Sequence, residues 1–516
     1  MINIKENSFS DLLSIEKITD NEIITPFPVV KKMVELLPEE IFKNPNNKFI
    51  DISSKSGIYL KYIFFYLLEK LPNINIDKNN NELDYILDQD YDFKNKEDKK
   101  RFILKYMIYG IATSELSFLT SKRTLYENIV ENEDTQKEGK ILSKPIFDNK
   151  DGNIVYKKIK DNQYWFLEEK NEIILKELSK NIKFKKDKKM KFNVIIGNPP
   201  YQKSNESGKG SDKPIYHNFI EKSIQLSPDF LSFIVPSRWF SGTKELQKFR
   251  QKIYNDNRIT KIYNFPNSEE CFSNVNITSG VHYFLWENKK NNDNLIDFYQ
   301  IKNNKIVNKV NKRKFNEFEI FITEEDIISI LYKVKNKEDF FYNKVVSGQT
   351  PFGLHTSFRN YNKDCTDSAN TKIYVSSNHN IPYGYINKNI ISKNKNLIDK
   401  YKVFIGKSNG AALKNRNIIS LPFLGEKNSA CTQTFLVVDS FNDINKCNNL
   451  IKYIKTKFFR FLVSIKKQTQ DNNREVFQYV PVLDMSKEWS DAELYERYNL
   501  TEDEINYIEN SIKEME

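Results

Sequence analysis

The sequence is poor in cysteine and contains no long hydrophobic run. Its four cysteines are scattered, and none stands in a C-x-x-C pair: Cys271, Cys365, Cys431 and Cys447. This distribution excludes a disulfide framework and a cysteine zinc site, and it is typical of a reduced cytoplasmic protein. The most apolar stretch, YIFFYLLEKL at residues 62–71, is too short to span a bilayer. The first 17 residues are charged throughout and lack the apolar segment of a secretory signal.

The length and composition indicate a globular protein of several domains. A chain of 516 residues exceeds one ordinary hydrophobic core, so we expect two or three domains. Apolar residues make up 39% and aromatic residues 13%, which excludes general disorder. The net charge of +11 is spread along the chain. This basic surplus fits either a polyanionic partner or a lysine-rich solvated surface.

The first part of the chain alternates predicted strands with predicted helices. Over residues 20–290 this alternation predicts an α/β domain with a mostly parallel sheet. Residues 128–190 are polar and charged, and we expect them to form an insertion. A lysine- and asparagine-rich stretch around residues 288–314 marks a change of character. We therefore place the end of the first domain near residue 300.

The second part has mixed signals. Short β-like runs, KIYVSS, KVFIGK and TFLVVDS, are followed by a predicted helix at residues 446–466. They indicate a mixed α+β domain at residues 315–485. Ser490 with Glu493, and Thr501 with Glu504, each form the S/T-x-x-E pattern of a capping box. These patterns predict a helical pair at residues 486–516.

One strand end carries an unusual combination of residues. The apolar run at 194–196 leads through Gly197 into Asn198-Pro199-Pro200-Tyr201. Proline has no N–H, so the ladder must end there, and two prolines make the loop stiff. The side-chain carbonyl of Asn198 and the next backbone carbonyl offer two acceptors for one –NH₂ group, and Tyr201 offers a stacking face. The pattern suits an exocyclic amine on a planar group; a plain strand-ending turn is the alternative.

Two acidic residues also lie at or just beyond the ends of predicted strands. Asp51 closes one strand, and Glu115 follows the strand at residues 108–111. In an open α/β sheet, ligands bind outside the carboxyl ends of the strands. Asp51, Glu115 and Asn198 are therefore expected to surround one site.

The motif at residues 198–201 resembles the catalytic motif of S-adenosylmethionine-dependent adenine-N6 DNA methyltransferases. The order of the other segments resembles the gamma class, and the nearest likeness is to Eco57I-type restriction–modification methylases. The resemblance implies a Rossmann-like, mostly parallel, seven-stranded-type methyltransferase sheet within residues 1–300, and a DNA target-recognition domain at 315–485. It also implies methyl transfer from S-adenosylmethionine to a flipped-out adenine in double-stranded DNA, without a metal, in a prokaryotic cytoplasm. No nuclease signature is present, and two alternatives stay open: a restriction endonuclease encoded separately, or a solitary methyltransferase.

The resemblance also implies roles for individual residues. Asn198, Pro199, Pro200 and Tyr201 would be catalytic, with Phe272 as a second stacking aromatic or simply a core side chain. The residues expected to bind the cofactor are Thr25, Pro26, Asp51, Ser53, Gly57 and Glu115. Glu115 is chosen because Ala112 stands where the family has its ribose-binding acid, and a surface role for Glu115 is the alternative. The cofactor loop departs from the family's Asp-Pro-x-x-Gly-x-Gly pattern at Ile52 and Lys55.

Three other functions remain open. A catalytically impaired DNA-binding relative is suggested by Lys55 in the cofactor loop. An N4-cytosine methyltransferase uses similar chemistry, although a serine in place of Asn198 would have favoured it. A protein-glutamine methyltransferase shares the Asn-Pro-Pro-Tyr tip, because a side-chain amide resembles an exocyclic amine, but such enzymes are much shorter.

Overall fold

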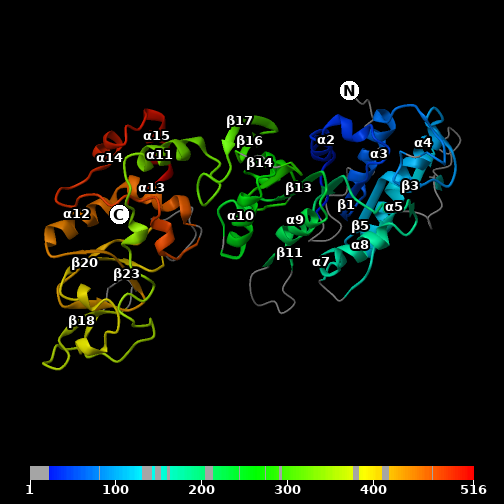
Figure 1. The fold of residues 1–516 in the computed structure, drawn as a ribbon. Coiled ribbons are helices and arrows are strands. Elements are labelled where there is room, and N and C mark those ends of the chain that lie inside the picture. Colours follow the sequence, from blue (N-terminus) through cyan, green and yellow to red (C-terminus); the bar gives the residue numbers. More distant parts are fainter. Residues whose placement is uncertain are drawn as a thin grey trace. The chain divides into compact units, whose positions relative to one another are not determined.

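The chain folds into two compact units, residues 1–319 and 320–516, drawn in Figure 1. The structure is a computed structural model. It describes residues 23–80, 82–130, 142–145, 153–159, 163–203, 213–242, 244–273, 275–289, 293–375, 383–408, 418–467 and 469–515. Among these residues, no helix combines the length and the apolar character needed to cross a membrane.

The first unit is built on a sheet of nine strands. Their spatial order is β17-β16-β14-β15-β13-β10-β1-β5-β8. In chain order the strands are β1 (Phe49–Ser54), β5 (Ile108–Ala112), β8 (Ile154–Val155), β10 (Val194–Gly197), β13 (Phe230–Pro236), β14 (Ile259–Phe265), β15 (Val281–Glu287), β16 (Leu295–Lys302) and β17 (Lys305–Lys314).

The strand directions confirm the expected fold class. Strands β8, β5, β1, β10 and β13 are mutually parallel. Strand β15 runs antiparallel to both of its neighbours, β13 and β14, whereas β14 and β16 are parallel. A mostly parallel sheet with its first strand near the middle is the Rossmann-like arrangement, in which the chain order reverses beside β1. Strands β16 and β17 extend the expected seven strands to nine.

Helices cover both faces of this sheet. Strands β1, β5 and β10 are buried at every position, which requires cover on both faces and explains their nearly continuous apolar sequence. Helix α3 (Ile58–Lys70) packs on β1 and β5 and also contacts α5 (Glu115–Tyr126). Helix α9 (Tyr216–Gln225) packs on β13. The helix α10 (Lys244–Asp256) lies between β13 and β14 in the chain.

Two stretches differ from the sequence-based prediction. Residues 128–190 were expected to be an insertion, yet β8 within them pairs with β5 and forms one edge of the sheet. Residues 288–314 were expected to mark a boundary, yet they contain all of β16 and β17. Strand β8 has only two residues, too few for an alternating pattern, and the many lysines and asparagines of β17 hide its strand character.

The second unit contains small sheets and several helices. Strands β18 (Thr371–Tyr374), β19 (Tyr383–Ile386) and β22 (Ser429–Cys431) form one sheet; β20 (Tyr401–Gly406), β21 (Phe423–Gly425) and β23 (Phe435–Phe441) form another. The helices are α11 (Glu325–Lys335), α12 (Ile444–Lys455), α13 (Lys457–Lys466), α14 (Asp491–Arg497) and α15 (Glu502–Ser511). Both predicted capping boxes are confirmed, at Ser490 and Thr501. Helices α14 and α15 both contact α13.

Candidate active site

The Asn-Pro-Pro-Tyr loop leaves the sheet at the carboxyl end of β10, between β1 and β13. Asn198, Pro199 and Pro200 are buried, and Tyr201 is partly exposed. The prolines end the ladder, as the sequence predicts. The loop is then held from outside, because Ile215 N donates to the carbonyl of Tyr201 at 3.0 Å.

The side chain of Asn198 is fixed by one long-range hydrogen bond. Its Nδ2 donates to the backbone carbonyl of Ile23 at 3.0 Å, and the residue is only 3% exposed. A carbonyl can only accept, so the amide nitrogen must face Ile23 and the amide oxygen must face away. Asn198 Oδ1 is buried without a hydrogen-bond partner among the described residues. A buried acceptor without a partner is costly in a finished core, so this oxygen is open to a donor from a ligand or from a water molecule.

Lys55 takes part in the same contact. Its Nζ donates to the carbonyl of Ile23 at 2.9 Å, and Lys55 is 6% exposed. The one carbonyl therefore accepts from the ammonium of Lys55 in the loop after β1 and from the amide of Asn198 in the loop after β10. Lys55, which stands where the family has a glycine, thus helps to join three segments at the carbonyl oxygen of Ile23: the N-terminal segment, the β1 loop and the β10 loop. Sequence reasoning missed Ile23, because a backbone carbonyl leaves no signal in the residue type.

Asp51 lies in the interior beside the same loop. It is 2% exposed, and its Oδ1 accepts from Ser53 N at 3.0 Å. Burial raises the pKa of Asp51 to about 7, and the hydrogen bond from Ser53 and the charge of Lys55 oppose this rise. Gly197 makes the close approach possible: a Cβ there would lie 2.5 Å from Asp51 Oδ1. Asp51 is therefore packed directly against the residue that precedes Asn198.

Aromatic side chains stand at the tip of the loop. The rings of Tyr201 and Phe272 meet edge to face, with their centroids 6.5 Å apart. Phe272 is buried and follows the short 3₁₀ turn Ser268–Glu270. The hydroxyl of Tyr201 is buried and has no hydrogen-bond partner among the described residues. The two aromatic residues that the sequence suggested are therefore in contact.

Gly57 has a structural reason beyond the one that the sequence suggested. Its φ of +77° lies in the left-handed region, where it caps helix α3. A Cβ at this position would also lie 3.0 Å from the Cα of Ser121 in α5. A side chain at Gly57 would therefore force α3 and α5 apart. The sequence argument had assigned the glycine to a close approach by a ligand.

Two cavities open at this edge of the sheet. The smaller, of about 10 Å³, has room for a single water molecule. Its lining includes five of the residues expected at the site: Thr25, Asp51, Ser53, Gly57 and Asn198. Ser53 Oγ, like Asn198 Oδ1, is buried without a partner among the described residues. Thr25 is buried as well, and its Oγ1 accepts from the hydroxyl of Tyr59 at 3.1 Å.

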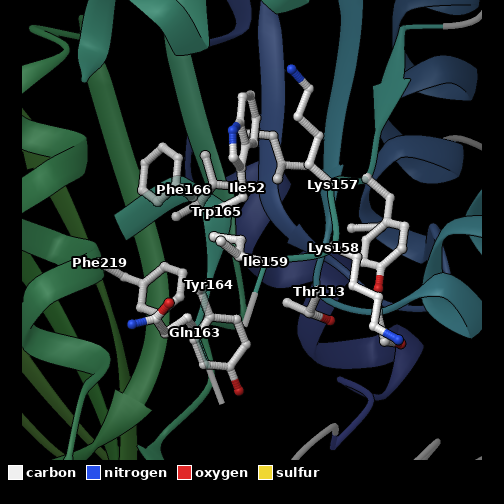
Figure 2. Close-up of a pocket in the computed structure, with 14 residues that line it drawn as sticks. Ile52, Thr113, Lys157, Lys158, Ile159, Gln163, Tyr164, Trp165, Phe166 and Phe219 are labelled. Atoms are coloured by element: carbon white, nitrogen blue, oxygen red, sulfur yellow. The ribbon is translucent and has the colours of Figure 1, made fainter. Parts of the chain in front are cut away.

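The larger cavity, of about 160 Å³, lies over the ends of β1, β5 and β8. Figure 2 shows Tyr164 and Phe219 on one side of it and Thr113 on the other. Ile52 lines it from β1, and Trp165 lines it from α7 (Trp165–Glu168). An aromatic and aliphatic slot with hydroxyl groups at its margin suits a flat heterocycle that carries a sugar. The residues from 156 to 166 were missed because no motif announces them.

Glu115 lies apart from both cavities' linings. It is exposed in the first turn of α5, while the neighbouring residues Thr113 and Ser114 line the larger cavity. Pro26 precedes α2 (Phe27–Glu35) and presets its first turn. The assignment of Glu115 to the cofactor therefore stays a prediction. Thr113 and Ser114, the hydroxyl residues just before Glu115, are the ones that line the larger cavity.

The first unit is an α/β methyltransferase-type domain. It combines a Rossmann-like sheet with a polar, buried site at the carboxyl edge of that sheet. Residues 106–272 match the model of the Eco57I restriction-modification methylase family. This segment spans β5, β10 with its Asn-Pro-Pro-Tyr loop, and Phe272. The family resemblance predicted from the sequence is thereby confirmed for this segment of the chain.

Two curated relatives extend the similarity. An uncharacterized adenine-specific methylase of Mycoplasma pneumoniae is 28% identical over 323 residues, covering 56% of this chain and 72% of the relative. The type II restriction enzyme and methyltransferase RM.Eco57I of Escherichia coli is 26% identical over 381 residues, covering 67% of this chain. The alignment spans only 36% of that longer enzyme.

Solved structures resemble the chain more weakly. The type IIG restriction endonuclease BpuSI has a TM-score of 0.38 and 11% identity, over 94% of this chain and 60% of its own. The type IIL restriction-modification enzyme MmeI, solved with DNA, also has a TM-score of 0.38, with 10% identity over 91% of this chain and 65% of its own. At these levels the similarity adds nothing to the argument from the residues.

Proposed function

We propose that the protein transfers a methyl group from S-adenosylmethionine to the N6 atom of adenine in DNA, as part of a restriction–modification system. The observation that carries this proposal is Asn198 Oδ1, a buried acceptor without a partner, beside the contacting rings of Tyr201 and Phe272. An acceptor next to flat aromatic faces matches an amino group on a heterocyclic base. The family match and the two curated relatives support the same reaction.

The loop's own residues would bind and orient the amine. Asn198 Oδ1 and the carbonyl of Pro199 would each accept one hydrogen from N6. Accepting both hydrogens moves electron density onto the nitrogen and fixes its direction, so that no strong base is needed. Tyr201 and Phe272 would hold the ring in place by contact with its faces and edge. Proximity and alignment would supply much of the rate.

The residues that line the two cavities have the chemistry to hold S-adenosylmethionine, and the smaller cavity, which has room for one water molecule, would have to widen for the cofactor's amino-acid part. When bound, this cofactor supplies a methyl group on a positively charged sulfur, open to direct displacement. The larger cavity, with Tyr164, Trp165 and Phe219, would hold its adenosine part. Asp51 and Ser53, beside Asn198 in the smaller cavity, would face its amino-acid part. Ser53 Oγ, buried without a partner among the described residues, favours this arrangement.

The target adenine would have to leave the duplex to reach this buried site. The net charge of +11 favours contact with the phosphate backbone. Within residues 315–485, where we place sequence recognition, Arg359 is exposed and Phe352 is fully buried in the core. Arg416 lies outside the described residues. Phe352 is therefore a packing residue, and the base contacts would come from exposed residues.

Methyl transfer can be tested directly with labelled cofactor. The purified protein, incubated with S-adenosylmethionine labelled in its methyl group and with mixed-sequence duplex DNA, should yield N6-methyladenine on nucleoside analysis. Label in N4-methylcytosine would show that the target base is cytosine and not adenine. Label in glutamine side chains of an added protein would show that the substrate is protein and not DNA. DNA binding without any label in DNA would identify an impaired relative and refute the proposal.

Lys55 offers a sharper test of the shared carbonyl. Replacing Lys55 by methionine removes a charged hydrogen bond of about 1.5–3 kcal/mol and loosens the Ile23 carbonyl that orients Asn198. We expect kcat to fall about tenfold, with the KM for DNA little changed, because the loss concerns orientation and not the binding of DNA. Steady-state kinetics of methyl transfer would measure both.

Lys48 provides the matched control for this variant. It is also a buried lysine, 3% exposed, and its Nζ donates to the carbonyl of Asn46 at 3.0 Å, but it lies at the opposite, amino end of β1. Lys48→Met should lower the melting temperature without a comparable fall in kcat. Equal falls in kcat for the two variants would mean that Lys55 acts only through general stability.

A further inference from the structure

The edge strand β17 carries an unusual surface. Its ten residues include five basic and no acidic side chains, and seven of the ten are exposed. Ile306 and Val307 are 54% and 56% exposed, directly after Lys305. Together with Lys302 and Lys309 they form a hairpin with three exposed lysines and two adjacent exposed aliphatic residues, which we name the basic hairpin (Lys302–Lys309). Packing of the central sheet does not require an exposed surface of lysines and aliphatic residues at this edge.

The topology brings the tip of the basic hairpin to the active-site edge. Strand β16 runs parallel to β14, which is parallel to the central strands, so its carboxyl end at Lys302 lies at the same edge as the end of β10. The backbone N of Asn303 donates to Glu270 Oε2 at 2.5 Å. Glu270 stands two residues before Phe272, which contacts Tyr201. The hairpin tip therefore adjoins the aromatic side of the catalytic loop.

The hairpin is held in a defined position. Asn303 and Asn304 have φ values of 52° and 58°, as a two-residue hairpin turn requires, and they join the paired residues Lys302 and Lys305. Behind the turn, the ring of Tyr299 stacks on that of Tyr263 at 4.3 Å. Lys309 Nζ lies 5.7 Å from the Tyr299 ring, on the same face. Figure 1 shows β16 and β17 continuing the sheet beyond β14.

We propose that the basic hairpin is a DNA-binding element that contacts the duplex next to the flipped base. This inference rests on the proposed function and adds a contact surface within the first unit. The lysines would neutralise phosphates, and a two-stranded ribbon has the width to enter a DNA groove. Exposed aliphatic side chains beside cations are the groups that proteins insert at base steps.

The competing explanation is protection of an open sheet edge. Lysines on an edge strand prevent another chain from pairing with it. That explanation accounts for the charges but not for two adjacent exposed aliphatic residues, which would promote edge pairing. It also makes no connection to DNA, so the two explanations predict different results.

The test compares two triple variants of the full chain. One replaces Lys302, Lys305 and Lys309 by glutamine. The matched control replaces three other exposed lysines of the first unit, Lys78, Lys94 and Lys96, which lie near α4 (Lys96–Phe102). Both variants lose three positive charges, so any general effect of net charge on DNA affinity should be the same in both. DNA affinity is measured from low to moderate salt, with melting temperature and gel filtration as checks on folding and assembly.

The hairpin variant should bind DNA about 10- to 100-fold more weakly at low salt, and the slope of log K against log salt should become shallower by about 0.9 for each lost phosphate contact. The control should keep the wild-type slope. Equal slopes for the two variants would overturn the proposal. Self-association of the hairpin variant, with a monomer that binds DNA as tightly as the wild type does, would overturn it as well. If the wild-type protein binds no DNA at all, the proposed function itself fails.

Discussion

Replacing Asn198 by alanine should abolish methyl transfer while leaving the fold and DNA binding nearly intact. The substitution removes the buried acceptor Oδ1 and the bond from Nδ2 to Ile23. Loss of one preorganised polar group at a reacting centre costs about 10²–10³-fold in kcat. The single lost hydrogen bond should lower stability by only about 1 kcal/mol. Incorporation of labelled methyl groups into DNA, followed over long incubations, measures the effect.

Asn193 supplies the control for this experiment. It lies just before β10, at the amino end of the same strand, and its Nδ2 donates to Asp229 Oδ2 at 2.6 Å. Asn193 Oδ1 also accepts from Lys48 N at 2.9 Å, so Asn193→Ala should lose more stability than Asn198→Ala and still keep its kcat. Methyl transfer by Asn198→Ala at a rate near that of Asn193→Ala would remove the central claim about the loop.

Replacing Gly197 by alanine should have the second largest effect. The new Cβ would stand 2.5 Å from Asp51 Oδ1 and 3.1 Å from Ser53 Oγ, and the φ of +152° disfavours any side chain. Neither neighbour can move into solvent, because both are buried. We expect a loss of about 2–4 kcal/mol in the free energy of unfolding, from overpacking and backbone strain together. Chemical denaturation monitored by circular dichroism would measure it.

The same substitution should also impair the cofactor site, because Asp51 and Ser53 would be displaced. Isothermal titration with S-adenosylmethionine should therefore show weakened binding by the folded fraction of Gly197→Ala. Gly348 is the matched control, since a Cβ there meets nothing within 4 Å. Gly348→Ala should change the free energy of unfolding by no more than about 0.5 kcal/mol. A Gly197→Ala protein as stable as this control would show that the space beside Asp51 is larger than the structure indicates.

The sequence predicted the parts of the site that depend on strong local rules. The loop at residues 198–201 was recognisable because two prolines must end a strand. The position of Asp51 followed from the rule that ligands bind at the carboxyl ends of parallel strands. The helix pair near the C-terminus followed from two capping boxes, both of which form. In each case a short stretch carries its own physical constraint.

Other parts depend on contacts that no local pattern records. Lys55 resembled a defect in the cofactor loop until its ammonium was seen on the carbonyl of Ile23. The two-residue strand β8 became part of the sheet only through its pairing with β5. The lysines of β17 suggested the end of the first domain, because an edge strand with exposed faces needs few apolar residues. Tertiary pairing, and not propensity, decided these elements.

The bond between Asn198 and Ile23 joins residues 175 positions apart in the chain. Synthesis proceeds from the N-terminus, and long-range contacts close late because the intervening chain must first be ordered. A growing chain on the ribosome therefore cannot complete this active site until the whole central sheet around β1, β5 and β10 has been made and folded. Nascent fragments that end before β10 would carry the cofactor loop without any catalytic loop, so they could not modify DNA before the rest of the protein exists.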